Sequence, residues 1–478
     1  MFMNRANPAV AVQILRKNIK GINQKVWVRG KKKKRYIHFD NAASTPALVP
    51  VLNDMSRFLE WYSGVHRGNG YKSMVSSRVY DDSHSVIGQF VKADLDRDSI
   101  IMVNNTTEGI NKLSYRLHLK PTDVVVTTDM EHHSNDLPWR GKGTVEYVRV
   151  DKDGVLDIEH AARILRKHYP QVKLLTVCGA SNVTGHVNDV HLLAEMAHEY
   201  GARIMVDGAQ LVPHRPFDMK PHSDPRHIDF IAFSGHKIFS PFGSGALIGP
   251  RELFTQNPPD YIGGGTVKIV MKKKVYWSDP PDSDEAGSPN VTGTYALART
   301  LTYLDRLGME KLQEHEEGLT SYLLEQISRI PGVTVYGSTD RVGVVTLNIN
   351  GLPHALVGAV LCYEAGIGTR TGCFCAQNYV RHLLSLEENP EHVKLYEQNR
   401  NDKIPGMVRV SLAGYNTRGE VDYFLQWLKD ISQNKNEFKQ RYRFFARQGS
   451  FVPVDFAGGS LVDKVYNRCM KGSLVPPK

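Results

Sequence analysis

Asp207 and Lys237 each follow a strand-like apolar run, close to the point where the run ends. Asp207 closes "ARIMVD", and Lys237 comes just after "IDFIAFSGH" and leads towards the glycine-rich turn "FGSG". A surface lysine needs no such setting, whereas a lysine that must act as an amine nucleophile on a buried group does. Because the ligands of open α/β sheets bind at the carboxyl ends of the strands, we expect both side chains at one site.

Three further polar segments follow predicted strands. "NTTEGIN" (105–111) can open a helix whose amides bind an anion, "EHHSN" (131–135) supplies an imidazole, and "SNVTGH" (181–186) follows "LLTVCGA". Together these groups favour pyridoxal phosphate: Lys237 would form a Schiff base with its aldehyde, and Asp207 would keep its pyridine nitrogen protonated. The remaining expected contacts are His132, stacked on the ring, and the phosphate donors Thr106, Thr107, Ser234 and His236.

Each of these features has a plainer interpretation when it is taken alone. A single aspartate at a strand end is more often a turn or cap residue. "EHH" lacks the HExxH spacing and has no cysteine pair nearby, so we expect no metal at this segment. "GSG" at 243–245 is a weak nucleotide-loop signal without GxGxxG. The prediction therefore depends on the order and setting of the whole set.

Seven apolar runs rich in β-branched residues indicate the strands that must position these groups. Helical patterns alternate with them, and several runs are apolar throughout, as in strands buried on both faces. This alternation predicts an α/β fold with a large, mostly parallel, seven-stranded sheet covered by helices. The runs are residues 99–105, 123–129, 143–150, 173–181, 202–210, 228–237 and 245–250.

A long helical pattern at 290–330, broken near Gly308, connects this sheet to a smaller C-terminal α/β unit. Four strand-like segments and the helical pattern "EVDYFLQWLKDISQ" indicate that unit. The polar segment 380–404 and the residues after 436 have no assigned structure. The predicted organisation is a basic N-terminal arm (1–35), a large cofactor-binding domain (36–305), a small domain carrying a cysteine loop (306–435) and a basic tail (436–478).

Composition is that of an ordinary globular chain. Of the 478 residues, 41% are apolar and 23% are charged, and no apolar run approaches the ~18–20 residues needed to span a bilayer. The N-terminus lacks the apolar core of a secretory signal. Five scattered cysteines favour a reducing compartment, so we expect a cytoplasmic protein with no membrane partner.

The excess positive charge lies at the N-terminus. Residues 1–39 hold 11 of the 60 basic residues and no acidic one, which leaves 49 basic against 50 acidic residues in the rest. The favoured interpretation is a solvated arm, and an acidic partner, nucleic acid or a transit peptide are alternatives. On this interpretation, deletion of residues 1–30 leaves turnover intact. Of these alternatives, we do not expect nucleic acid as a partner.

In order along the chain, these segments resemble the class V aminotransferase family of fold-type I pyridoxal phosphate enzymes. Within it, they are most similar to the SufS-like cysteine desulfurases and selenocysteine lyases. The resemblance covers most of the chain, from "FDNAAST" at 39 to "NTRGEVDYFLQWL" at 428. The matching landmarks include "GVHRGNGY", "NTTEGIN", "EHHSNDLPW", "VDGAQ", "FSGHK", "GGGT", "EAGSPN", "RTGCFCA" and "RVSLAGYNT".

The resemblance implies roles for further residues. Gln210 would contact the ring hydroxyl, Asn182 would lie near that hydroxyl and the substrate carboxylate, and Arg409 would clamp the carboxylate with its planar guanidinium. Thr266 would reach the phosphate of a neighbouring subunit, which implies a homodimer, and His66 would lie near the substrate entrance.

The cysteines of "RTGCFC" decide between reactions. By the resemblance, Cys375 is the nucleophile of a desulfurase, although a free cysteine is commonly a small buried hydrophobe. Where desulfurases usually have two histidines, this chain has Cys373 and Phe374, which is similar to molybdenum cofactor sulfurases. Cys373 could resolve a persulfide or only pack. In an extended loop, residues two apart point the same way, so both thiols could face the site.

The sequence therefore predicts a pyridoxal phosphate-dependent cysteine desulfurase. It would convert L-cysteine to L-alanine, leave a persulfide on Cys375 and pass the sulfur to an acceptor protein, with Lys237, Cys375 and His132 as catalytic residues. The first alternative is a selenocysteine or C–S lyase, or an aminotransferase- or epimerase-like enzyme. The second is a non-enzymatic basic binding module, which the intact lysine, aspartate and arginine disfavour.

Overall fold

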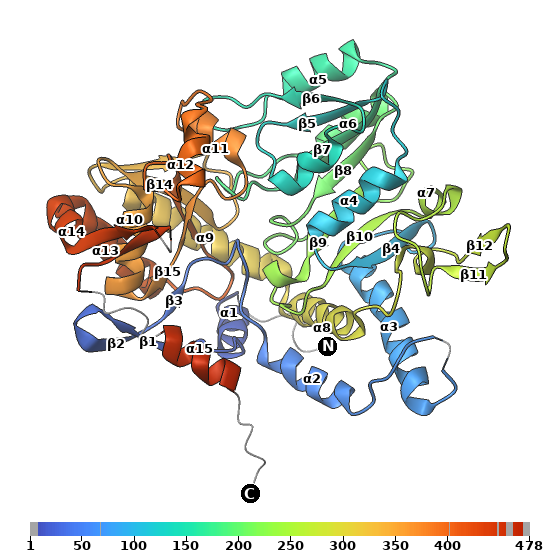
Figure 1. Ribbon diagram of the computed structural model, residues 1–478, viewed down its shortest axis with the longest axis horizontal. Coiled ribbons are helices and arrows are strands. Elements are labelled where there is room, and N and C mark those ends of the chain that lie inside the picture. The colour runs from blue at the N-terminus through green and yellow to red at the C-terminus, as the bar shows by residue number, and fades with distance from the viewer. Residues whose placement is uncertain (1–7, 67, 401, 447–448, 456–461, 472–478) are drawn as a thin grey trace, which may run out of the picture.

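The computed structural model describes residues 8–66, 68–400, 402–446, 449–455 and 462–471. The seven predicted runs form one seven-stranded sheet of order β4-β10-β9-β8-β7-β5-β6. β10 is antiparallel to both of its neighbours and the other pairs are parallel, which confirms the predicted architecture (Figure 1). The strands are β4 (Asp98–Val103), β5 (Val124–Thr128), β6 (Thr144–Val148), β7 (Val172–Cys178), β8 (Arg203–Asp207), β9 (Phe230–Ser234) and β10 (Gly245–Pro250).

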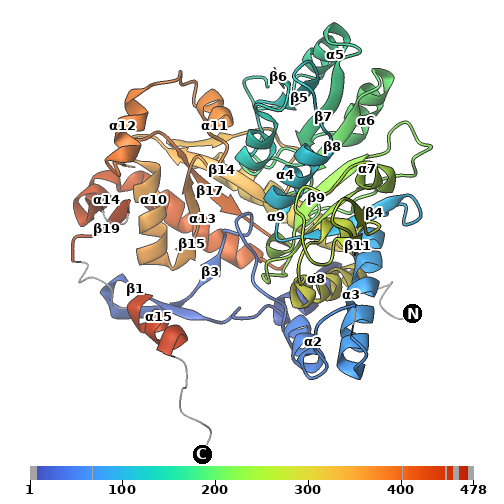
Figure 2. The same cartoon turned by 45° about the vertical axis from the view of Figure 1, so that its right-hand side comes forward.

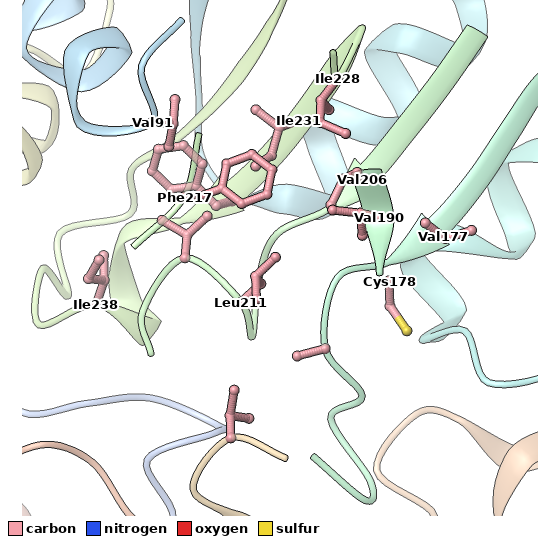
Figure 3. Close-up of a cluster of buried hydrophobic side chains, with 14 of the residues drawn as sticks. Val91, Val177, Cys178, Val190, Val206, Leu211, Phe217, Ile228, Ile231 and Ile238 are labelled. Atoms are coloured by element: carbon pink, nitrogen blue, oxygen red, sulfur yellow. The ribbon is translucent and has the colours of Figure 1, made fainter. Parts of the chain in front are cut away.

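Helices cover both faces of this sheet. Met205 of β8 packs with Ile110 of α4 in one apolar cluster, whereas Val206 joins Val190 and Leu193 of α6 in another, as the alternation of side chains along a strand requires. Figure 3 shows Val177, Val190 and Val206 in the second cluster. The helices of this domain are α2 (Val49–Leu59), α3 (Tyr71–Phe90), α4 (Thr106–Arg116), α5 (Ile158–Lys167), α6 (Val190–Glu199), α7 (Arg251–Gln256) and α8 (Val291–Leu307).

The long helical pattern is broken at Gly308, as predicted. α8 ends at Leu307, Gly308 has φ 90°, and α9 (Met309–Ile327) continues into the smaller domain. Glycine adopts this left-handed backbone without the clash that a Cβ brings. An exposed hairpin of β11 (Val267–Val270) and β12 (Val275–Trp277) precedes α8.

The smaller domain contains a four-stranded antiparallel sheet of order β13-β14-β17-β16 (Figure 2). The predicted strand at 366–372 is split in two: β15 pairs in parallel with β3 of the N-terminal segment, and only β16 joins this sheet. The strands are β3 (Ile37–His38), β13 (Val333–Tyr336), β14 (Val344–Ile349), β15 (Ile367–Gly368), β16 (Arg370–Gly372) and β17 (Met407–Ser411).

The segments that the sequence left unassigned contain helices and a pair of antiparallel strands. The polar stretch 380–404 contains the end of α11 and all of α12. Beyond residue 436, Phe438 and Tyr442 are buried in the core of the smaller domain and Phe451 packs against it, so the predicted tail is joined to that domain as far as Pro453. The remaining helices and strands of this part of the chain are α10 (His354–Val360), α11 (Gln377–Leu383), α12 (Glu391–Glu397), α13 (Arg418–Gln433), α14 (Lys435–Arg441), β18 (Tyr442–Phe445), β19 (Ser450–Pro453) and α15 (Val462–Lys471).

The N-terminal segment is folded, which corrects the expectation of a solvated arm for residues 8–35. α1 (Pro8–Lys17) buries Ala11, Val12 and Leu15 in the large core. Arg16 forms an ion pair of 2.7 Å with Glu420 of α13. The sequence analysis did not predict this helix, because its apolar face is short and the segment is dominated by basic residues.

The basic cluster 31–35 is also mostly ordered. β1 (Lys25–Val28) and β2 (Lys32–Arg35) form an antiparallel hairpin. Lys33 lies over the Trp27 ring at 4.6 Å, and Lys34 lies over Tyr423 of α13 at 5.0 Å. Two of the positive charges of this cluster are therefore stabilised by aromatic rings within the folded protein. Within the described ranges, no helix combines the length and apolarity needed to cross a bilayer.

We expect Leu15→Ala to destabilise the protein, because Leu15 is fully buried and its truncation leaves a cavity at the junction of α1 with the large core. Such a change in a core costs about 2–5 kcal/mol. The melting temperature should fall clearly, whereas Val10→Ala, at a position on the same helix that is 43% exposed, should leave it unchanged. Equal melting temperatures for the two variants would restore the solvated-arm interpretation.

Candidate active site

A cavity of about 550 Å³ lies at the carboxyl ends of β7, β8 and β9 and is lined by residues of both domains. It brings together every predicted site residue except His66 and Thr266. The large domain contributes Thr106, Thr107, His132, Asn182, Asp207, Gln210, Ser234, His236 and Lys237, and the smaller domain contributes Cys375 and Arg409.

Lys237 and Asp207 are close because their strands are neighbours. β8 and β9 are parallel, with Asp207 opposite Ala232, and Lys237 lies in the short turn that follows β9. Burial lowers the pKa of Lys237 to about 8, although the Asp207 carboxylate opposes this shift. Burial raises the pKa of Asp207, while Lys237 and the Ala209 amide act to lower it. The neutral, nucleophilic amine is therefore accessible much closer to neutral pH than in a free lysine.

His132 is a neutral imidazole with a fixed proton. Burial and the nearby Lys237 charge lower its pKa to about 3. The Ser134 amide donates to Nδ1 at 3.1 Å, so Nδ1 is an acceptor and the proton lies on Nε2. An uncharged planar ring in this position is suited to stacking on another ring.

Behind His132 lies a buried carboxylate that the sequence analysis missed. Glu131 accepts hydrogen bonds from the Thr128 hydroxyl, the Asn135 amide group and the Cys178 backbone amide, at 2.6, 2.7 and 2.9 Å. Burial raises the pKa of Glu131 to about 7. These bonds fix the loop that carries His132 against β7. "EHHSN" contained the residue, but nothing in the spacing indicated which way it points.

The beginning of α4 forms an anion pocket. Asn105 caps the helix by accepting from the Glu108 amide, and the Thr106 amide donates to the Ser234 hydroxyl at 2.8 Å. The Thr106 and Ser234 hydroxyls are 2.7 Å apart, and Thr107 lies 2.7 Å from the Ser134 hydroxyl. Hydroxyls and amides gathered at a helix N-terminus bind phosphate well.

Two buried polar atoms in the cavity wall are unsatisfied. Gln210 donates to the Ala42 carbonyl at 2.7 Å, but its Oε1 has no partner among the described residues, and neither does Nε of Arg409. Such atoms cost free energy unless a ligand satisfies them. With the amine, the carboxylate, the neutral imidazole and the anion pocket, these groups fit pyridoxal phosphate and an amino-acid carboxylate.

Arg409 is buried beside a carboxylate that the sequence analysis did not single out. Its guanidinium donates to the Asn182 carbonyl at 2.9 Å and to Asp40 at 3.3 Å, and burial lowers its pKa to about 10. Arg370 forms a second ion pair with Asp40 at 2.9 Å. Two guanidiniums thus share one carboxylate, so the wall keeps the positive charge that a substrate carboxylate needs.

Cys375 is exposed and lines this cavity. Its carbonyl accepts from the His133 amide at 2.7 Å, and the Phe374 carbonyl accepts from the Asn182 side chain at 2.6 Å. The loop backbone is therefore held from the large domain while the thiol stays free to react.

Cys373 faces another cavity, which corrects the expectation that both thiols could face one site. Its Sγ donates to the Pro405 carbonyl at 3.6 Å and lines a separate pocket of about 190 Å³ beside α11 and α12. Burial raises the pKa of Cys373. The cause of the divergence is the backbone: Phe374 and Cys375 have φ of 51° and 56°, so the loop is not extended.

His66 and Thr266 are not brought to the cavity of this chain. His66 lies between α2 and α3 with its Nε2 3.0 Å from Asp81, and Thr266 donates to the Gly263 carbonyl at 2.9 Å. The role expected for Thr266 concerns the site of a neighbouring subunit. Both assignments stay predictions.

The chain is similar to known proteins over most of its length. The family model of class-V aminotransferases matches residues 37–424. A cysteine desulfurase of Haloferax volcanii is 36% identical over 397 residues, which cover 81% of this chain and 87% of that protein. A cysteine desulfurase of Pectobacterium atrosepticum is 33% identical over 404 residues, with 82% and 92% covered.

The fold is also similar to that of solved structures. The apo structure of a cysteine desulfurase from Thermococcus onnurineus matches with a TM-score of 0.76 and 30% identity, covering 88% of this chain and 98% of that one. An Escherichia coli cysteine desulfurase in an S-sulfonic acid form matches with a TM-score of 0.74 and 26% identity, covering 90% and 100%. With the fold, the cavity and these matches in agreement, the chain belongs to the class-V aminotransferase family.

Proposed function

We propose that this chain is a pyridoxal phosphate-dependent cysteine desulfurase that forms a persulfide on Cys375. The observation that carries the proposal is the exposed Cys375 thiol in the same cavity as the buried Lys237 amine and the Asp207 carboxylate. Curated relatives with the name cysteine desulfurase support the same reaction. The free state of all five cysteines fits a reducing compartment such as the cytoplasm.

Different residues of the cavity would bind different parts of the cofactor. Lys237 would hold it covalently, Asp207 would face its ring nitrogen, and His132 would stack on its ring, while Thr106 and Ser234 donate to its phosphate. Thr107, His236, Asn182 and Gln210 complete the wall around it. When bound, pyridoxal phosphate supplies an electron sink that stabilises negative charge at the α-carbon of an amino acid.

Arg409 and Lys237 then prepare the substrate. Arg409 would bind the carboxylate of L-cysteine through Nε, which has no partner among the described residues, while its two terminal nitrogens already donate to Asn182 and Asp40. Lys237 would remove the α-proton, for which a pKa near 8 is suitable.

Cys375 completes the reaction. Its thiolate would attack the substrate sulfur and form an S–S bond as the carbon–sulfur bond of the substrate breaks. The electron pair of the broken bond stays with the carbon skeleton, which takes up a proton and leaves as L-alanine. The terminal sulfur on Cys375 would then pass to an acceptor protein. The enzyme would act as a homodimer in which Thr266 reaches the phosphate of the neighbouring site, and His66 would lie near the substrate entrance.

The attachment residue can be tested by chemical trapping. Borohydride reduction of the protein with its cofactor, followed by peptide mapping, should place the cofactor mass on Lys237, because this amine is buried beside Asp207. Lys237→Ala should lose both the label and alanine formation. A label on any other lysine would refute the assignment.

The pKa of Lys237 predicts a pH profile. Burial makes the neutral amine the majority species above pH about 8, so the rate at which cofactor-free protein attaches the cofactor should rise as pH increases through about 8. Asp207→Asn should move this midpoint lower, because the Asp207 charge raises the pKa of Lys237. As a control, Asp218→Asn removes a half-exposed carboxylate paired with Lys92 and should not move it. A wild-type midpoint near 10.5 would show that the amine is not desolvated.

Substitutions of the two cysteines of the loop should have clearly different effects. Cys375→Ser should bind L-cysteine but neither gain the mass of one sulfur atom nor release alanine, because its hydroxyl cannot attack the substrate sulfur. Cys373→Ser should keep both, since Cys373 faces another cavity. Intact-protein mass spectrometry and alanine assay measure the two outcomes. If neither change affects alanine release, a C–S lyase takes the place of the desulfurase.

A further inference from the structure

Two histidines and an aspartate converge away from the active-site cavity. His198 lies near the end of α6, and His227 and Asp229 directly precede β9, at the opposite end of that strand from Lys237. Their candidate ligand atoms all lie within 4.8 Å of one another. Ile228, between His227 and Asp229, points into the core (Figure 3), so its two neighbours point together to the opposite side.

The hydrogen bonds of the two imidazoles fix their tautomers. Nδ1 of His198 lies 2.7 Å from the Pro225 carbonyl, and Nδ1 of His227 lies 2.9 Å from the Asp224 carbonyl. A carbonyl only accepts, so both protons are on Nδ1. In each neutral ring, Nε2 is then unprotonated, and its lone pair points away from the carbonyl that Nδ1 contacts.

Both Nε2 atoms face the same carboxylate. Nε2 of His198 is 2.8 Å from one Asp229 oxygen, and Nε2 of His227 is 3.3 Å from the other. Lone pairs of nitrogen and oxygen at these distances repel unless a proton or a cation lies between them. Among the described residues, the two histidines are the only ion-pair partners of Asp229.

One solution is a second proton on each ring, and the hydrogen bond to Asp229 raises the pKa of His227, but two protonated rings would repel each other. The His198 and His227 rings are stacked with centroids 4.3 Å apart, so two imidazolium charges would be in contact. His222 is also stacked with His227, at 5.3 Å, and pairs with Asp98 at 2.9 Å. One divalent cation among the three ligand atoms satisfies all the lone pairs without this ring-to-ring repulsion.

The two nitrogen–oxygen separations, 2.8 and 3.3 Å, are compatible with such an ion. Ligand atoms bonded to zinc at ~2.0–2.1 Å in a tetrahedral arrangement lie ~3.3 Å apart. The carbonyls of Pro225 and Asp224 orient the imidazoles, and the Ile204 amide, which donates to Asp229 at 2.8 Å, orients the carboxylate. Backbone groups that hold metal ligands from behind in this way are typical of real sites.

We propose that His198, His227 and Asp229 form a binding site for a divalent transition ion, with Zn²⁺ as the preferred ion. Two imidazole nitrogens and one carboxylate oxygen match the donors that zinc takes, and the partial exposure of the histidines leaves room for water as a fourth ligand. The ion ties the C-terminal part of α6 to the segment before β9. It has a structural role and does not depend on the proposed desulfurase reaction.

The test uses Co²⁺ as a spectroscopic probe and Zn²⁺ as the ligand, on the full chain with its cofactor after treatment with a chelator. One equivalent of Co²⁺ should give visible d–d bands without the near-ultraviolet band of a thiolate ligand, and Zn²⁺ should displace it and raise the melting temperature. His198→Gln and His227→Gln should lose the bands and the thermal shift. His191→Gln is the matched control: His191 lies on the same helix and bonds the Arg226 carbonyl at 2.8 Å, but it does not face Asp229, so this variant should behave as wild type.

A second measurement needs no variant. Zn²⁺ should slow the modification of His198 and His227 by diethylpyrocarbonate, mapped by mass spectrometry, and should leave that of His191 unchanged. A thiolate band, or binding that persists in His198→Gln, would place the ion on cysteine and overturn the proposal. Absence of stoichiometric binding together with no protection would overturn it too, and would identify the cluster as two protonated imidazoles around one aspartate.

Discussion

The burial of an amine beside a carboxylate is the constraint on which the site depends. Lys237 and Asp207 are 30 residues apart and meet only because β8 and β9 are neighbours in a parallel sheet. Apolar layers cover both faces of these strands, with Met205 on one side and Val206 on the other. Since desolvation is the main cause of the lowered pKa of Lys237, the packing of the strands is also a chemical property of the site.

The N-terminal segment connects the two domains at this site. β3 pairs with β15 of the smaller domain, and the Asn41 side chain donates to the Ser411 carbonyl of β17 at 2.8 Å. In the same segment, the Ala42 carbonyl accepts from Gln210 in the large domain, and Asp40 holds Arg409. The cavity wall thus contains residues of both domains. The ion pair between Arg16 of α1 and Glu420 of α13 also fixes the N-terminal segment to the smaller domain.

Much of this was predictable, for reasons of local chemistry. Runs of β-branched residues predicted all seven strands, and Gly308 predicted the helix break because only glycine readily takes its left-handed backbone. The order of polar residues along the strand ends predicted part of the cavity wall, whereas Gln210, Arg409 and Cys375 were expected there only from the family resemblance. The short helix α1 was missed because its three buried residues are embedded in a segment whose composition is dominated by charge. The cluster of His198, His227 and Asp229 was missed because it joins two elements across the fold, which no spacing within one motif reveals.

Residue patterns could not predict which way the side chains of the cysteine loop point. That direction depends on a strained backbone, which contacts from other parts of the fold hold in place. Phe374 and Cys375 both adopt left-handed backbone, which is costly for residues with a Cβ and persists only where other contacts stabilise it. Those contacts come from the substrate-binding wall: Asn182 donates to the Phe374 carbonyl, and the Arg409 guanidinium lies over the Phe374 ring at 4.9 Å. The residues proposed to bind the substrate carboxylate therefore also hold the loop that presents the nucleophile. On the proposed function, a substrate carboxylate bound at Arg409 would contact the side chain that supports Phe374, next to Cys375, so substrate binding and the position of the thiol would be coupled through one side chain.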